Sequence, residues 1–239
     1  MTERIFITGD KHGSFYPLFG LADHVDLEPS DVLLIAGDAG YVWDENYHGN
    51  IETLQQLFPG TIAFIDGNHE NHQMLSEFEL TRWNGGQVHQ ISDRIFHMMR
   101  GELYSIYGKN FFAFGGARSV DKHRREEGVS WWKEEEPSVE EMEYAAAQLE
   151  KHLADIDYVI THETPLFARD FIKRTKEIDE DYTLPAFLDD WYEQIREQEK
   201  FCRWYFGHMH VDQTITPQLR ALHNEILLIG EEDQSIRWV

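Results

Sequence analysis

The sequence predicts a mixed α/β fold, and three observations support this prediction. In the first third of the chain, short runs rich in Val, Ile and aromatic residues alternate with helical segments, which is typical of βαβ units around a parallel sheet. In the middle, apolar runs separated by short polar turns indicate antiparallel hairpins. The 239 residues contain no internal repeat and no Pro/Gly/Ser-rich linker, so we expect a single domain over residues 1–239.

The expected elements follow in chain order. The apolar runs of the first third predict strands at 4–9, 31–36 and 61–66, with helices at 15–24 and 50–58 between them. Hairpin strands are predicted at 88–91, 95–99, 102–106 and 111–115. A helix at 138–153 begins with Ser138 and has Glu141 three residues on, the pattern of a capping box. The remaining expected elements are a helix at 185–199 and strands at 157–161, 202–206, 221–229 and 235–239.

The composition is strongly acidic, with a formal net charge of −23. Such a field repels the phosphate backbone, which argues against a long nucleic acid as substrate or partner. The sequence has no apolar run of transmembrane length, and its N-terminus lacks the form of a signal peptide. The single cysteine, Cys202, excludes an intrachain disulfide and is expected to be buried beside a strand. We therefore expect a cytoplasmic protein without membrane contact; the sequence does not predict its oligomeric state.

Metal-binding residue types gather at the ends of five predicted strands. The five clusters are Asp10-Lys11-His12, Gly37-Asp38, Gly67-Asn68-His69-Glu70, Thr161-His162 and Gly207-His208-Met209-His210. In α/β sheets, ligands bind at the loops that follow the carboxyl ends of the strands. Mixed nitrogen and oxygen donors without sulfur suit divalent metals, and imidazole favours transition metals among them.

Each cluster taken alone has an ordinary structural explanation. Asp-x-His arises by chance, Gly-Asp is a common turn, and a histidine beside a strand is usually a hydrogen-bonded structural residue. Five such clusters in series, each at a strand end, favour a metal site over coincidence.

The ordered series resembles the motif of the calcineurin-like metallophosphoesterase superfamily: Asp-x-His, Gly-Asp, Gly-Asn-His-Asp/Glu, a lone His and Gly-His-x-His. The match spans residues 10–210. The resemblance implies two facing mixed sheets flanked by helices, a four-layer αββα sandwich with two metal ions at the sheet edge. It implies that the first metal is held by Asp10, His12, Asp38 and His210. It implies that the second is held by the bridging Asp38 together with Asn68, His162 and His208.

Such a site predicts hydrolysis of a small, soluble phosphate ester. Two divalent ions can clamp a phosphoryl centre, and a metal-bound hydroxide can attack phosphorus without a protein nucleophile. Manganese is the expected metal, with iron, zinc, nickel and magnesium as alternatives. The resemblance makes His69 a catalytic residue that is not a ligand, protonated near the leaving oxygen, and makes Glu70 the carboxylate that orients it.

The chain departs from the protein Ser/Thr phosphatases of this superfamily. Those enzymes continue the Gly-Asp motif to an Asp-Arg-Gly and place an arginine before Gly-Asn-His-Glu. Here Gly40-Tyr41 and Asp66 occupy the corresponding regions. We therefore expect a slight preference for a phosphodiester. A phosphomonoesterase or protein phosphatase is the alternative, and a nuclease or a catalytically inactive binding scaffold is less favoured.

A replacement cation for the phosphate is expected from the basic segment 115–125. Its Gly-Gly-Ala-x-Ser-x-Asp pattern resembles small bacterial and phage members of the superfamily, and Arg118 is the expected phosphate ligand. Local pairing of the arginines with Glu126 and Glu127 is an equal alternative. His72 follows the third cluster closely and is expected either to bind substrate or to support the metal ligands from behind. Trp131-Trp132 is expected to pack.

Overall fold

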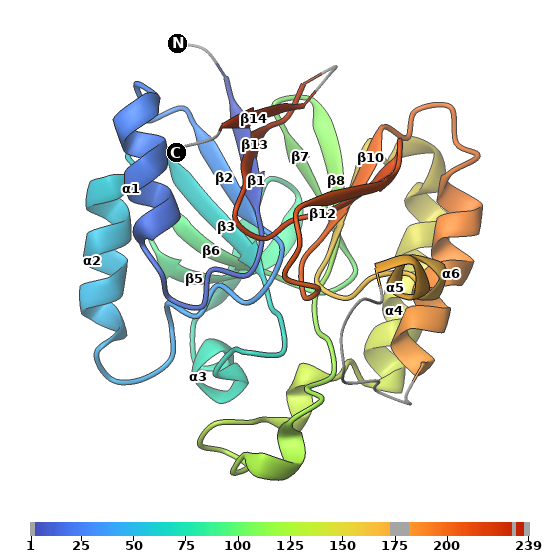
Figure 1. Ribbon diagram of the computed structural model, residues 1–239, viewed down its shortest axis with the longest axis horizontal. Coiled ribbons are helices and arrows are strands. Elements are labelled where there is room, and N and C mark those ends of the chain that lie inside the picture. The colour runs from blue at the N-terminus through green and yellow to red at the C-terminus, as the bar shows by residue number, and fades with distance from the viewer. Residues whose placement is uncertain (1–2, 173–181, 231–232, 237–239) are drawn as a thin grey trace.

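A computed structural model describes residues 3–172, 182–230 and 233–236. Two mixed β-sheets face each other, and helices cover the outer side of each sheet (Figure 1). The layers follow the order helices, sheet, sheet, helices, which confirms the predicted fold class. Among the described residues, no helix is long and apolar enough to cross a membrane.

The larger sheet is built around parallel strands contributed mainly by the first third of the chain. In spatial order its strands are β14 (Gln234–Ile236), β13 (Ile226–Leu228), β1 (Ile5–Thr8), β2 (Val32–Ile35), β3 (Thr61–Ile65), β6 (Ile95–Met98), β5 (Gly86–Ser92) and β4 (Leu80–Trp83). Strands β1, β2, β3 and β6 are mutually parallel, and the outer strands are antiparallel to their neighbours. Helices α1 (Tyr16–His24) and α2 (Tyr47–Leu57) cover the outer face (Figure 1).

The smaller sheet is formed by strands between residues 102 and 221. In spatial order its strands are β11 (Gln213–Thr216), β12 (Leu219–Ala221), β10 (Arg203–Phe206), β9 (Tyr158–Thr161), β8 (Lys109–Phe114) and β7 (Glu102–Ile106). Helices α4 (Val139–His152), α5 (Leu166–Ile172) and α6 (Thr183–Ile195) cover its outer face (Figure 1). The predicted capping box is present: Ser138 Oγ accepts from Glu141 N, and Glu141 accepts from Ser138 N.

Side chains of the central strands alternate between two apolar layers, as the two-residue period of a strand requires. Ile5 and Ile7 of β1 point between the sheets, whereas Phe6 points outward and packs beneath α1 and α2. Tyr158 and Ile160 of β9 join the layer between the sheets from the other side. Both faces of the central strands are therefore buried, which explains their continuous apolar sequences.

The structure corrects the end of the predicted element order. The strand predicted at 221–229 is wrong, because this stretch divides into β12 in the smaller sheet and β13 in the larger one. The carboxylate of Asp212 accepts hydrogen bonds from the backbone N–H groups of His223, Asn224 and Glu225, and this turn carries the chain from one sheet to the other.

Smaller differences concern elements with weak sequence signals. Helix α2 begins at Tyr47 rather than near residue 50, and α3 (His72–Ser76), β4, α5 and β11 were not predicted. Cys202 is exposed rather than buried, because it precedes β10 instead of lying within it. The predicted strand at 235–239 falls partly on residues outside the described part of the chain.

A long excursion, the 117–136 loop, separates β8 from α4 and projects beyond the sheets on the side where β8 ends (Figure 1). It contains two short 3-10 turns, Lys122–Arg124 and Lys133–Glu135. Trp132 is buried against Trp43, with ring centroids 5.4 Å apart, so the predicted packing role of Trp132 is confirmed.

Candidate metal centre

The polar clusters lie on loops at the carboxyl ends of the central strands of both sheets, where they meet. Five of these residues have left-handed backbone conformations: Asp10, His12, Asp38, His208 and His210, with φ between 48° and 65°. Such angles are uncommon outside glycine and tend to cluster at functional sites. The backbone therefore turns sharply at these positions and directs several side chains to one place.

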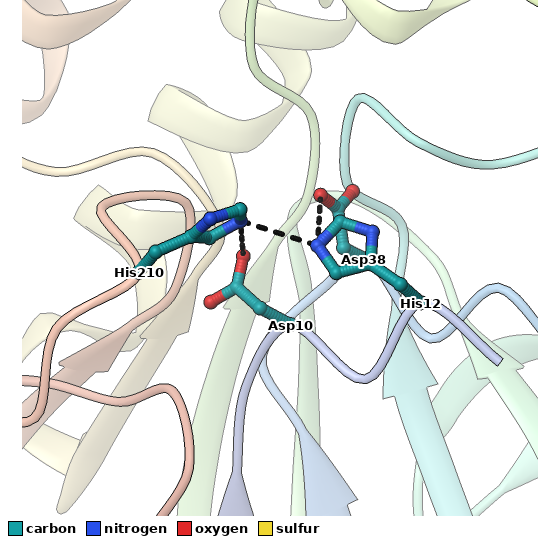
Figure 2. Close-up of side chains that lie close together, drawn as sticks. All are labelled: Asp10, His12, Asp38 and His210. Atoms are coloured by element: carbon teal, nitrogen blue, oxygen red, sulfur yellow. Dashed lines mark hydrogen bonds and ion pairs between the residues drawn. The ribbon is translucent and has the colours of Figure 1, made fainter. Parts of the chain in front are cut away.

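Four side chains form a first group, shown in Figure 2. One ligand atom from each of Asp10, His12, Asp38 and His210 lies within 4.8 Å of the others. Nε2 of His210 is 3.1 Å from Nε2 of His12 and 3.5 Å from Oδ1 of Asp10. Nε2 of His12 is 3.7 Å from Oδ2 of Asp38. This group is a candidate site for one divalent metal ion.

Two buried carboxylate oxygens in this group support that assignment. Oδ1 of Asp10 accepts from the backbone N–H of His208, and Oδ1 of Asp38 accepts from that of His69. The second oxygen of each carboxylate, Oδ2, is buried and has no hydrogen-bond partner. A buried, unpaired anionic oxygen is costly unless a cation or donor satisfies it. These residues therefore fit a metal ion.

A second group of donors lies beside the first. Oδ1 of Asn68 is 3.1 Å from Nε2 of His162 and 2.9 Å from Nδ1 of His208. Nε2 of His162 is also 3.3 Å from Oδ1 of Asp38. Asp38 thus faces the first group with one carboxylate oxygen and the second group with the other. The carboxylate of Asp38 therefore lies between the two groups of donors.

Burial shifts the proton affinities of these side chains. Burial, reinforced by the nearby Asp38, raises the pKa of Asp10 to about 7. Burial lowers the pKa of His12 to about 4 and that of His208 to about 3. For His162, burial also acts to lower the pKa, but the Asp38 carboxylate outweighs it and raises the pKa to about 10. Burial thus disfavours the charged form of Asp10, which a bound divalent cation would stabilise.

Neighbouring groups fix the orientation of the second group. Nδ1 of His162 donates to the carbonyl oxygen of Ala36 at 2.9 Å, which leaves Nε2 to face the other donors. Nε2 of His208 lies 3.7 Å from Oε2 of the buried Glu163. Sequence reasoning missed Glu163, although it directly follows His162 at the end of β9.

A buried hydrogen-bond chain holds Asn68. Its Nδ2 donates to Oγ of Ser119 at 3.0 Å, and Ser119 in turn donates to the buried Glu135 through Oγ (2.6 Å) and its backbone N–H (2.8 Å). With its amide nitrogen engaged, Asn68 turns its oxygen toward the histidines. Only spatial proximity could identify Glu135, which the sequence presents as one member of an acidic run.

His69 lies beside the first group without joining it. Its ring centroid is 5.2 Å from that of His12, and its Nδ1 is 2.8 Å from Nη1 of Arg125. Burial lowers the pKa of His69, and Arg125 acts in the same direction. A ring nitrogen that accepts a hydrogen bond from arginine carries no proton. In this arrangement His69 is therefore neutral, whereas protonation was expected.

The structure gives Glu70 a place different from the one expected. Glu70 is fully buried, and its carboxylate accepts from the backbone N–H groups of Ala39 (2.7 Å) and Gly40 (3.2 Å). It thus holds the loop that carries Asp38 and makes no hydrogen bond to His69. The chain turns after Asn68, so adjacent residues point to opposite sides of the loop.

The two predicted substrate-binding residues lie outside both groups of donors. Arg118 lines a small pocket with Glu163 and Arg169. His72 lines a separate cavity of about 710 Å³ with Asp66 and Arg100, and its buried Nε2 has no hydrogen-bond partner. Substrate binding by Arg118 and His72 stays a prediction.

Comparisons with known proteins support the fold. No protein-family model matches the chain, and no curated protein matches it in sequence. The crystal structure of TT1561 of Thermus thermophilus is similar over 99% of this chain and 100% of its own, at 12% identity and a TM-score of 0.52. A second solved structure has the same coverage, at 14% identity and a TM-score of 0.54.

A weaker likeness links the chain to the sulfate thiohydrolase SoxB of Thermus thermophilus, at 10% identity and a TM-score of 0.43. It covers 92% of this chain and 42% of that one. The likeness to TT1561 shows that the two chains share a fold over essentially their whole lengths.

Proposed function

We propose that this protein is a metal-dependent phosphoesterase that hydrolyses a small phosphate ester, with a preference for phosphodiesters. The observation that carries the proposal is the position of Asp38, whose two carboxylate oxygens face two adjacent groups of nitrogen and oxygen donors. Side chains from both sheets complete these groups, and none of the donors is a sulfur atom.

The donor set suits two divalent ions. Asp10, His12, Asp38 and His210 would hold one ion, and Asp38, Asn68, His162 and His208 would hold the other. Manganese fits this mixture of imidazole, carboxylate and amide oxygen, and iron, zinc, nickel and magnesium are the alternatives. When bound, such ions polarise a phosphoryl oxygen and acidify coordinated water.

The chain's own residues supply orientation and proton handling. Ala36 and Ser119 fix the ligands His162 and Asn68 through hydrogen bonds. His69 stands beside the first group with its ring free of any metal-ligand role, so it is suited to exchange a proton with the leaving oxygen. His69 would take up that proton when its contact with Arg125 is released.

The preference for a diester follows from the charges around Asp66. This residue occupies the place of an arginine in the phosphatases, and Arg100 pairs with it inside the protein, with Nε 3.0 Å from Oδ2. The pair leaves no positive charge there for a dianionic phosphate. A diester carries one negative charge less and needs fewer cations. The net charge of −23 further favours a small substrate over a nucleic-acid chain.

The decisive experiment compares hydrolysis of bis(p-nitrophenyl) phosphate and p-nitrophenyl phosphate with added Mn²⁺. Asp38→Asn is the test variant, and Asp23→Asn, an exposed position on α1, is the matched control. Diester activity that Asp38→Asn loses and Asp23→Asn keeps would support the proposal. A monoester preference would make the protein a phosphomonoesterase, and a metal-loaded protein inactive on both esters would overturn the proposal.

A further inference from the structure

One cation of the 117–136 loop reaches the candidate metal centre. The guanidinium of Arg125 lies against the ring of His69, with Nη1 2.8 Å from Nδ1 and Nη2 3.4 Å from Nε2. The two residues are 56 positions apart in sequence and come from different parts of the fold. The loop therefore delivers a positive charge to the side of the centre where His69 lies.

Arg125 is held in place from two sides. Its Nε donates to Oδ1 of Asp121 at 2.8 Å, across the 3-10 turn Lys122–Arg124, and its Nη1 donates to the carbonyl oxygen of Ser130 at 3.2 Å. The side chain is only 21% exposed. A guanidinium braced through Nε keeps its terminal N–H groups aligned in one direction, which lowers the entropy lost when they bind an anion.

The partner that Arg125 now has is a weak one for such a group. A neutral imidazole offers a single acceptor nitrogen, whereas a phosphate offers several anionic oxygens in the geometry that a guanidinium matches. The other arginines near the centre have different surroundings. Arg100 is paired with Asp66, and Arg118 lines a pocket with Glu163 on the side of His208.

We propose that Arg125 is an anion-binding residue of this site, which donates hydrogen bonds to a non-bridging oxygen of the phosphate ester while Asp121 holds it in position. This proposal rests on the proposed phosphoesterase function. When substrate binds, the guanidinium exchanges the ring of His69 for the phosphate. The loop that carries Arg125 thereby contributes to recognition of the phosphate group.

The test uses Mn²⁺-loaded protein and two measurements, the affinity for inorganic phosphate by calorimetry and the KM for bis(p-nitrophenyl) phosphate. Arg125→Gln removes the charge, and Arg124→Gln, exposed and adjacent, is the matched control. We expect Arg125→Gln to weaken phosphate binding and raise KM by about 10- to 100-fold, the range for a hydrogen bond to a charged group. Metal content and melting temperature should match the wild type.

Two further variants separate recognition from loop structure. Arg125→Lys should restore part of the affinity, because it keeps the charge and loses the fork of two donors. Asp121→Asn should weaken phosphate binding less than Arg125→Gln. It removes only the contact that orients the guanidinium and leaves the positive charge of Arg125 in place. A purely structural role would instead lower the melting temperature of Arg125→Gln and leave phosphate affinity and KM unchanged. That result would overturn the proposal.

The failure of this proposal is distinguishable from the failure of the proposed function. The wild type could hydrolyse neither ester and still bind phosphate, with Arg125→Gln abolishing that binding. This result would support the anion site and overturn the hydrolytic function. If the wild type is active and Arg125→Gln binds phosphate as tightly as Arg124→Gln, the function stands and the role of Arg125 is overturned.

Discussion

Gly67 and Asp38 approach each other so closely that no side chain fits between them. A Cβ atom on Gly67 would stand 2.1 Å from Oδ1 of Asp38 and 2.8 Å from Nε2 of His162. The loop after β3 therefore passes directly against the donors of the loops after β2 and β9. Gly67 fulfils a packing requirement of the centre, since its lack of a side chain lets three ligand-bearing loops converge.

Gly67→Ala should therefore damage the metal centre and spare the rest of the fold. The added methyl displaces Asp38, the residue between the two donor groups, and we expect metal affinity to fall at least about tenfold. Metal titration of the purified variants measures this. Gly49→Ala is the control, because a Cβ at that helical position meets nothing within 4 Å. Equal metal affinity in both variants would contradict the prediction.

Ser119→Ala should weaken metal binding through Asn68. The variant removes the hydroxyl that accepts from Nδ2 of Asn68, so the amide loses the contact that fixes its orientation. Loss of such an outer partner typically costs about 10- to 100-fold in metal affinity. Competition with a calibrated chelator provides the measurement. Ser105→Ala, at an exposed position of β7, should bind metal like the wild type.

Arg100→Met should destabilise the fold strongly. Arg100 and Asp66 form a buried ion pair, and removal of the guanidinium leaves the carboxylate of Asp66 charged and without its main partner. Breaking a buried pair in this way costs about 3–5 kcal/mol in the free energy of unfolding. Urea denaturation should show this loss. Arg196→Met, which breaks an exposed pair with Glu193, should cost about 1 kcal/mol or less.

Metal-free protein should lose stability as the pH falls from about 6.5 to about 4. Burial lowers the pKa of His72 to about 4, below its ordinary value of 6.5. Between these two values the unfolded chain takes up a proton at this residue and the folded chain does not, so acid favours unfolding. Urea midpoints measured across this range test the effect. His72→Gln should make the dependence less steep, with His12 and His208 accounting for part of what remains, and the exposed His48→Gln serves as the control.

The sequence predicted which side chains converge on the metal centre better than it predicted the residues that surround and orient them. Asp10, Asp38 and Asn68 each follow an apolar run, and the parallel strands β1, β2 and β3 necessarily bring these ends to one edge. Local pattern was therefore enough for this half of the site. The facing of the two sheets, which brings His162 and His208 to the same place, followed only from resemblance to a known fold.

The local sequence pattern could not predict which residue of a loop would take which role. Arg118 and Arg125 lie seven residues apart in one basic segment, and a 3-10 turn with its Asp121 contact decides which guanidinium meets His69. Glu70 adjoins His69 in sequence, yet its carboxylate is held by the backbone after β2. In each case a contact made across the fold, which the sequence does not display, decides where the side chain points.

The centre has a consequence for the order in which the protein is assembled. Asp10, Asp38 and Asn68 lie on loops of the larger sheet, whereas His162 and His208 lie on loops of the smaller one. Strand β13, at residues 226–228, pairs with β1, so the first strand finds one of its neighbours about 200 residues further along the sequence. The donors from the two sheets can therefore meet only after strands distant in sequence have paired. A bound ion would mark a chain in which both sheets have already come together.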